Sequence, residues 1–122
     1  MKLLRTPDQT CIVERLQSAE SYFTRLKGLI GKKEFKNGEG LLFPRCNSIH
    51  MWMMSIPIDA VFLKSQKDSS VSQWVVTSIH RELKPWKLLP VMDSSADDVL
   101  ELPAGTASAI SLKVGEVLCI AW

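Results

Sequence analysis

The sequence predicts a single α+β domain in which a β-sheet predominates. Three observations support this: a length of 122 residues, several short apolar runs bounded by turn residues, and only two segments with helix signals. Hydrophobic residues make up 46% of the chain, enough for one core, and we expect one domain over residues 1–122. The expected sheet is mixed or antiparallel, or a partly closed barrel, with one amphipathic helix near the N-terminus and one short helix near the C-terminus.

The first third of the chain predicts two short strands on either side of the main helix. Residues 11–13 and 41–43 are short apolar runs of strand type. Between them, Ser18 is a suitable N-cap, and Gly31 followed by two lysines is a helix stop signal. We therefore expect an amphipathic helix from Ser18 to Gly31, because apolar residues recur there at helical spacing: Tyr22, Phe23, Leu26, Leu29 and Ile30.

The central part predicts three strands and one long irregular segment. Residues 49–54, 58–64 and 71–79 are rich in the apolar and β-branched residues that strands favour. The polar stretch 66–70 separates the last two runs, so we expect these to pair as a hairpin. Residues 83–96 contain two prolines and paired serines, and irregular segments of this length are often functional.

The C-terminal part predicts two further strands and a short helix. Residues 99–102 resume a strand pattern, and the turn 103–105 leads into a segment of small residues that predicts a short helix over about 106–111. A second turn at 113–116 precedes the last predicted strand, residues 117–120. The chain contains no internal repeat or linker, in agreement with one domain.

Composition and charge limit the classes of partner. The formal net charge of +2 is too small to indicate a nucleic-acid-binding surface, so we expect no nucleic-acid partner. No segment has the apolar length of a membrane span or a signal peptide, and we expect a cytoplasmic protein, or the mature form of an exported one whose leader is absent. We expect a monomer or weak homo-oligomer. The odd number of cysteines, three, favours reduced thiols over disulfides.

Two ionisable residues, His50 and Asp59, interrupt the nearly continuous apolar run from His50 to Leu63. An unpartnered carboxylate in a strand buried on both faces would be costly, so Asp59 requires a partner, contact with solvent or a function. In the structural interpretation, Asp59 accepts hydrogen bonds from backbone amides or an arginine, and His50 bonds a backbone carbonyl. In the functional interpretation, His50 is a general base that Asp59 orients. No convincing nucleophile accompanies the pair.

Other side chains were considered for metal, anion and aromatic binding. Cys46 and His50 could both bind zinc, but two ligands do not make a site, so we expect neither a metal nor a cofactor. Arg25 borders the apolar face of the predicted helix and is a candidate for a bidentate contact with a carboxylate, either a ligand's or that of Asp59. Trp86, in the irregular segment, either fixes that loop or lines the mouth of a pocket.

Several short motifs follow one another in an order that resembles a known family. They are Arg25-x-x-Gly28-Leu29, Gly38-Glu39-Gly40-Leu41-Leu42-Phe43, His50-Met51-Trp52-Met53-Met54-Ser55-Ile56-Pro57-Ile58-Asp59-Ala60-Val61-Phe62, Leu83-Lys84-Pro85-Trp86-Lys87, Val99-Leu100-Glu101-Leu102-Pro103-Ala104-Gly105-Thr106-Ala107 and Leu112-Lys113-Val114-Gly115-Glu116. Over about residues 20–120 this resembles the uncharacterised bacterial and archaeal family called domain of unknown function 192.

The resemblance implies a compact β-rich α+β fold and no established activity. Polar and aromatic positions that the family pattern repeats correspond to Arg25, His50, Asp59, Trp86 and Glu101. The chain also departs from the pattern. The family usually has glycine and arginine in the motif after its histidine, where this chain has Met53 and Ser55.

These observations lead to one preferred function and two alternatives. The preferred prediction is a small domain that binds a small molecule or a peptide in a cleft near Asp59, lined also by Arg25, His50 and Trp86. The first alternative is an acid/base or hydrolytic enzyme in which His50 is the base and Asp59 orients it. The second is a non-enzymatic protein–protein interaction module with exposed aromatic residues, Trp86 and Trp122.

Overall fold

The computed structural model describes residues 1–6, 8–18, 35–49, 56–66, 72–85 and 89–121. Eight strands form one sheet: β1 (Lys2–Arg5), β2 (Thr10–Val13), β3 (Arg15–Ser18), β4 (Glu39–Phe43), β6 (Ile58–Ser65), β7 (Gln73–Leu83), β9 (Asp98–Pro103) and β10 (Val117–Ala121). Two short strands, β5 (Ser48–Ile49) and β8 (Val91–Met92), pair in a separate small sheet. The described helix is α2 (Thr106–Ala109).

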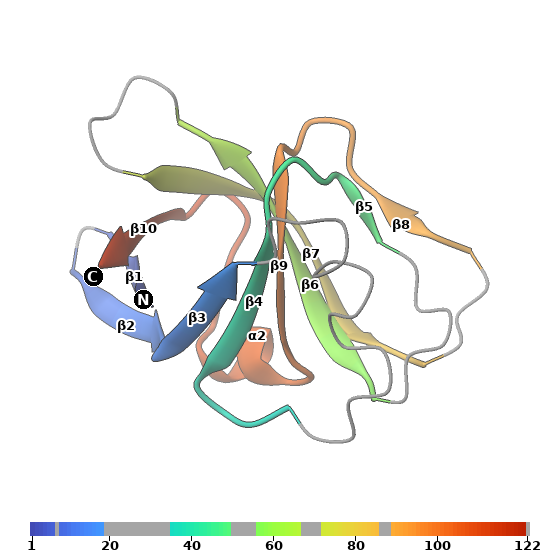
Figure 1. Ribbon diagram of the computed structural model, residues 1–122, viewed down its shortest axis with the longest axis horizontal. Helices are drawn as coiled ribbons and strands as arrows, with labels where there is room; N and C mark the ends of the chain where they lie inside the picture. The colour runs from blue at the N-terminus through green and yellow to red at the C-terminus, as the bar shows by residue number, and fades with distance from the viewer. Residues whose placement is uncertain (7, 19–34, 50–55, 67–71, 86–88, 122) are drawn as a thin grey trace.

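The large sheet has the strand order β2-β1-β10-β7-β6-β9-β4-β3 (Figure 1). Its described ladders are antiparallel except for the pair β3 and β4, which is parallel. The expected β-rich single domain with a mainly antiparallel sheet is thereby confirmed. The sheet does not close into a barrel, because no ladder among the described strands joins its two edge strands, β2 and β3.

The helix prediction is borne out only at the C-terminal end. The short helix expected over about 106–111 corresponds to α2. The amphipathic helix expected from Ser18 to Gly31 falls almost entirely in residues 19–34, which lie outside the described residues. The described part of the chain therefore contains one short helix, and the prediction of two helices is not borne out.

The core of the sheet is β6, which lies between β7 and β9. The first six residues of β6, Ile58–Leu63, are all buried, which explains why this segment is apolar without alternation. The predicted hairpin is confirmed, since β6 and β7 pair antiparallel along most of their length. The strand predicted over 49–54 lies outside the described residues except for Ile49, which belongs to β5.

The two faces of the sheet are covered by different elements. Successive residues of a strand point to opposite faces, so Val61 and Phe62 belong to different clusters. Val61 packs in the cluster that contains Ala107 of α2, and we call this side the α2 face. Phe62 packs in the cluster that contains Val91 of β8, and we call this side the β8 face.

The sheet curls strongly, because Glu14 alone separates β2 from β3, the strands at its opposite edges. The Leu16 amide donates to the Met1 carbonyl at 2.9 Å, which ties β3 to the start of β1. Gly40 lies where β4 passes close to β2: a Cβ on Gly40 would stand 2.9 Å from Cγ1 of Val13. The absent side chain of Gly40 therefore permits the tight curvature.

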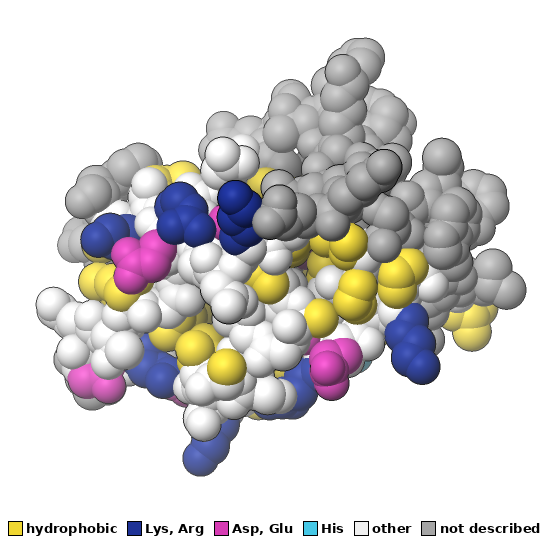
Figure 2. All heavy atoms as spheres, turned by 90° about the horizontal axis from the view of Figure 1, so that it is seen from below, with side chains coloured by type: hydrophobic (Ala, Val, Ile, Leu, Met, Phe, Trp, Pro, Cys, Tyr) yellow, Lys and Arg dark blue, Asp and Glu magenta, His cyan; other side chains and the backbone are white. Residues whose placement is uncertain are grey.

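The surface charges, the cysteines and the helix length can each be compared with the expectations from the sequence. Figure 2 shows acidic and basic side chains interspersed on the face seen from below, with hydrophobic side chains in several places between them. The thiols of Cys11, Cys46 and Cys119 are free, as expected. Among the described residues we find no helix with the length and apolar character that crossing a membrane requires.

Candidate functional site

Asp59 is fully buried on the α2 face, and three backbone amides donate to its carboxylate. The amide of Ala107 donates to Oδ2 at 2.8 Å. The amides of Glu82 and Gly105 donate to Oδ1 at 2.8 and 3.2 Å. Of the partners expected from the sequence for Asp59, the structure contains the backbone amides.

These hydrogen bonds fix the ends of three elements. Gly105 has φ 91° and provides no side chain to cap α2, so Asp59 supplies the acceptor at the start of this helix. Glu82 is a non-glycine residue with φ 52°, an unfavourable backbone conformation that its charge-assisted hydrogen bond helps to hold. Asp59 thus anchors β6 to the end of β7 and to the turn that follows β9.

The other predicted site residues lie outside the described residues. They are Arg25, His50 and Trp86, and Trp122 of the interaction-module alternative lies outside them as well. Among the predicted site residues, Asp59 is the one whose surroundings the structure describes. The convergence of Arg25, His50 and Trp86 with Asp59 stays a prediction.

Glu101 is a second acidic residue inside the sheet, on the β8 face. It lies on β9 between Leu41 of β4 and Ala60 of β6, each of which is its partner in the ladder. The residue is only 6% exposed, and no described residue donates a hydrogen bond to its carboxyl group. Burial raises the pKa of Glu101 to about 8, because the charged form loses its hydration. At neutral pH, Glu101 is mostly an uncharged carboxylic acid.

His80 lies on the same face, one strand beyond Ala60. Ala60 pairs with Glu101 on one side and with His80 on the other. Two strand spacings separate the backbones of Glu101 and His80, about 10 Å, and the small side chain of Ala60 lies between them. The ring of His80 stands edge-on to that of Phe62, with 5.4 Å between ring centroids and an interplanar angle of 81°. This contact helps to fix the orientation of the ring.

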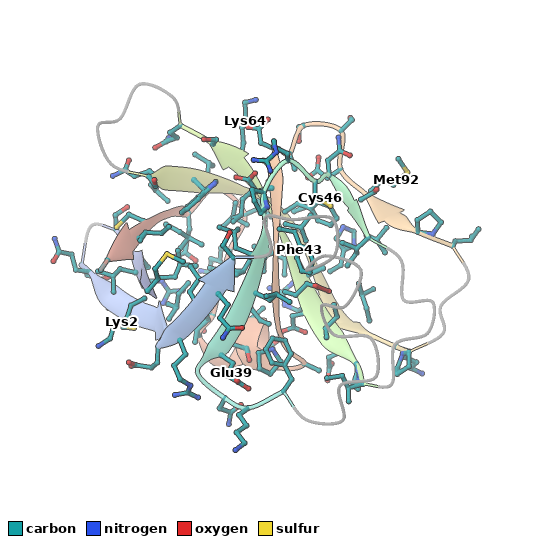
Figure 3. The ribbon with its side chains drawn as sticks, viewed as in Figure 1. Lys2, Glu39, Phe43, Cys46, Lys64 and Met92 are labelled. Carbon is teal, nitrogen blue, oxygen red and sulfur yellow. The ribbon has the colours of Figure 1, made fainter. Side chains whose placement is uncertain are left out.

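The other carboxylates of this face have hydrogen-bond donors. Glu39, at the opposite end of β4 from Phe43 (Figure 3), accepts the amide of Lys36 at 2.6 Å. Asp93 accepts the hydroxyl of Ser95 and, at 2.7 Å each, those of Ser78 and Thr77, and these hydrogen bonds hold its pKa well below the usual range. Glu101 differs from both because it combines burial with the absence of a described donor.

Glu101 and His80 were not predicted as site residues, although the sequence holds a signal for one of them. Glu101 interrupts the apolar run Val99–Leu102 just as Asp59 interrupts its own run. His80 could be placed only with the register of β6 and β7, which composition does not give. Among the described residues, no group of three or more His, Cys, Asp or Glu side chains could hold a metal ion.

A family model described as "Uncharacterized ACR", domain of unknown function 192, matches residues 4–120. The chain belongs to this family. Domain of unknown function 192 therefore extends here from β1 to β10 and includes Asp59, His80 and Glu101. A search of curated proteins gives no match to this member of the family.

Two solved structures share the fold of this domain of unknown function 192. A protein of unknown function from Novosphingobium aromaticivorans DSM 12444 has a TM-score of 0.80 and 23% identity, over 100% of this chain and 84% of that one. A protein from Sinorhizobium meliloti 1021, named a "putative transcription regulator", has a TM-score of 0.77 and 21% identity, over 96% of this chain and 88% of that one. At these identities the likeness shows the fold alone.

Proposed function

We propose that this protein binds a small molecule or a peptide on the β8 face, over Ala60, between Glu101 and His80. The observation that carries the proposal is Glu101, a residue only 6% exposed whose pKa is raised by burial and not lowered by any hydrogen bond from the described residues. Buried polar groups in proteins nearly always have a hydrogen-bond partner. A ligand that donates to Glu101 would supply this partner.

The energetics of Glu101 support a function more than a structural role. A buried carboxyl group without a hydrogen bond destabilises the fold by about 1–3 kcal/mol relative to one that is paired. Leucine would fill the position between Leu41 and Ala60 without this cost. Residues with a strongly perturbed pKa are candidates for binding and catalytic sites, and Glu101 combines a raised pKa with burial inside the sheet.

Asp59 takes a positioning role in this proposal. It precedes Ala60 in β6, and its hydrogen bonds fix the end of β7, two residues beyond His80, and the turn after β9. The strands that carry Glu101 and His80 are thereby held at a fixed separation from opposite sides of Ala60. We propose that the residues predicted from the sequence line the same cleft: Arg25, His50 and Trp86.

A thermal-shift screen of a small-molecule library tests the proposal. A ligand present at about 100 times its Kd stabilises the folded state by about 2.7 kcal/mol, which raises the Tm of a domain of this size by about 10 °C. We expect compounds that stabilise the wild-type protein but not Glu101→Gln. Glu39→Gln is the matched control, because it also removes a carboxylate from this face but leaves Glu101 in place. A library in which no hit depends on Glu101 refutes the proposal.

One observation favours the enzyme alternative in a modified form. Both oxygens of Asp59 already accept backbone hydrogen bonds, which disfavours Asp59 as the group that orients His50. Glu101, by contrast, has a pKa of about 8, near the pH at which a general acid or base is most effective. Incubating each screening hit with the protein and following the compound by NMR distinguishes a binder from a catalyst. Consumption of the hit by wild type but not by Glu101→Gln would establish acid/base chemistry.

A further inference from the structure

We infer that the ribbon formed by β5 (Ser48–Ile49) and β8 (Val91–Met92) is a lid, which opens to let a ligand reach Glu101. The inference rests on the proposed function and concerns access to the same site. Figure 1 shows the ribbon to one side of the large sheet, and its two strands pair with each other and not with the described strands of that sheet. In this closed form Glu101 is 6% exposed and Ala60 is fully buried. A ligand that contacts both residues therefore requires an opening.

The ribbon covers the site with the side chains of Ile49 and Val91. Val91 is buried in the cluster that contains Ala60 and Phe62. Ile49 packs against that cluster and also against Ile58. Ile58, Ala60 and Phe62 are alternate residues of β6, so their side chains form one row on the β8 face. The two sets of contacts place the ribbon over this row, at the centre of the proposed site.

Hydrogen bonds anchor one end of the ribbon. The carboxylate of Asp93, the residue after β8, accepts the hydroxyls of Thr77 and Ser78 of β7 at 2.7 Å each. On the other strand, the Cys46 amide, two residues before β5, donates to the Asp97 carbonyl at 2.9 Å. Both anchors lie where β5 begins and β8 ends, so this end is the fixed side of a hinge.

Apolar packing holds the other end. Ile49 ends β5 and Val91 begins β8, and the two residues are partners in the ladder. The described contacts of this end with the large sheet are those of its apolar side chains. A ladder of two residue pairs adds little rigidity, because a two-stranded ribbon is marginally stable in water. Opening therefore swings Ile49 and Val91 away from β6 while the Asp93 end stays in place.

The lid sets the affinity of the site. A ligand that binds only the open form has its affinity reduced by the fraction of molecules that are open. Val91→Ala removes two buried methyl groups from the closed form, and this change should raise the open fraction about tenfold. The affinity for any compound that depends on Glu101 should increase by the same factor.

Thiol labelling measures the opening without a ligand. Glu101→Cys places a thiol under the lid, where iodoacetamide reacts with it only after opening. Leu102→Cys is the matched control, because it is the next residue of β9 and is also buried, but on the α2 face, which the ribbon does not cover. We expect Glu101→Cys to react at least tenfold faster than Leu102→Cys without denaturant, with peptide mass spectrometry separating each new thiol from the native cysteines.

Two valine substitutions distinguish opening of the lid from unfolding of the whole domain. Combined with Glu101→Cys, Val91→Ala should raise the labelling rate about tenfold. Val76→Ala, in the cluster on the α2 face, should change that rate less than about twofold. Amide hydrogen exchange makes the test independent of how any variant folds. In the wild-type protein, we expect the amides of β5 and β8 to exchange through a local opening that low urea does not accelerate, and those of β6 and β9 through global unfolding.

The lid is overturned if Glu101→Cys and Leu102→Cys react equally fast, if the two valine substitutions have the same effect, or if the amides of β5 and β8 exchange only through global unfolding. If local opening is found but no compound depends on Glu101, the lid stands and the proposed function fails. If compounds depend on Glu101 and no local opening is found, the lid is wrong and the proposed function stands.

Discussion

The raised pKa of Glu101 predicts that the folded protein loses stability as the pH rises. The ordinary pKa of a glutamate, 4.5, applies in the unfolded chain, and in the folded protein the pKa is about 8. Between these values the folded state holds a proton that the unfolded state has lost, so the free energy of unfolding decreases with pH. The stabilisation is fully present below about pH 4.5 and is lost as the pH rises toward about 8.

The size of the effect follows from the shift. Each pKa unit corresponds to about 1.4 kcal/mol, so the full shift is worth about 5 kcal/mol as an upper limit, and water entering near the carboxyl group would reduce it. Urea unfolding of wild type and Glu101→Gln at a series of pH values measures it, and the difference between the two proteins isolates this residue. Glu39→Gln controls for the loss of a half-buried carboxylate on the same face. The reasoning is refuted if the free energy of unfolding of wild type differs from that of Glu101→Gln by the same amount at about pH 5 and at about pH 8.

Three further predictions concern the fold around the site. Asp59→Ala leaves three backbone amides without an acceptor and should lower the free energy of unfolding, measured in urea, by about 4 kcal/mol. Asp97→Ala, the control, leaves only the Ser65 amide without this acceptor and should lower it by about 1 kcal/mol. Equal losses in the two variants would contradict the anchoring role of Asp59. Gly40→Ala should lower the free energy of unfolding by about 1–3 kcal/mol, because its Cβ would clash with Cγ1 of Val13. In a Val13→Ala background the clash disappears, and the same substitution should cost much less. If the effects of the two substitutions on the free energy of unfolding simply add, the contact is unimportant. The pKa of Asp93 is lower in the folded protein than in the unfolded chain, where it is about 3.8, so ionised Asp93 stabilises the fold above about pH 3.8 and this stabilisation is lost as the pH falls. Asp93→Asn should therefore reduce the loss of unfolding free energy at acidic pH, measured by urea unfolding. An unchanged pH dependence would count against the hydrogen bonds from Ser95, Ser78 and Thr77.

The strands that the sequence predicted well are those buried on both faces. The run 58–64 corresponds to β6 and the run 99–102 to β9, because central strands need continuous apolar residues. The edge strand β2 and the last strand β10 were also predicted, as the runs 11–13 and 117–120, but β1 and β3 were missed. β1 and β3 each mix charged and apolar residues over four positions, too few to show a period. Their strand structure comes from pairing with distant segments rather than from local preference.

The candidate site was predictable in part. The burial of Asp59 and its need for partners followed from one charge in an apolar run, and the structure supplied the partners as backbone amides from the end of β7 and from the segment that follows β9. No sequence pattern could name those amides, since every residue but proline carries one. Glu101 carried the same signal, but its relation to His80 depends on the register of three strands, which is set by the whole sheet.

The position of β1 between β2 and β10 has a consequence for how the chain folds. β10, whose residues Val117–Ala121 come late in the sequence, is the neighbour that joins β1 and β2 to the rest of the sheet. Until β10 is in place, the first two strands form a hairpin that is tied to the rest of the sheet through β3, by the hydrogen bond from the Leu16 amide to the Met1 carbonyl, and a two-stranded hairpin is marginally stable in water. During synthesis, β4, β6, β7 and β9 can pair before β10 has left the ribosome, and the N-terminal hairpin must wait for it. Folding should therefore finish slowly, because pairing the two ends of the chain carries the largest loop-closure entropy in the molecule.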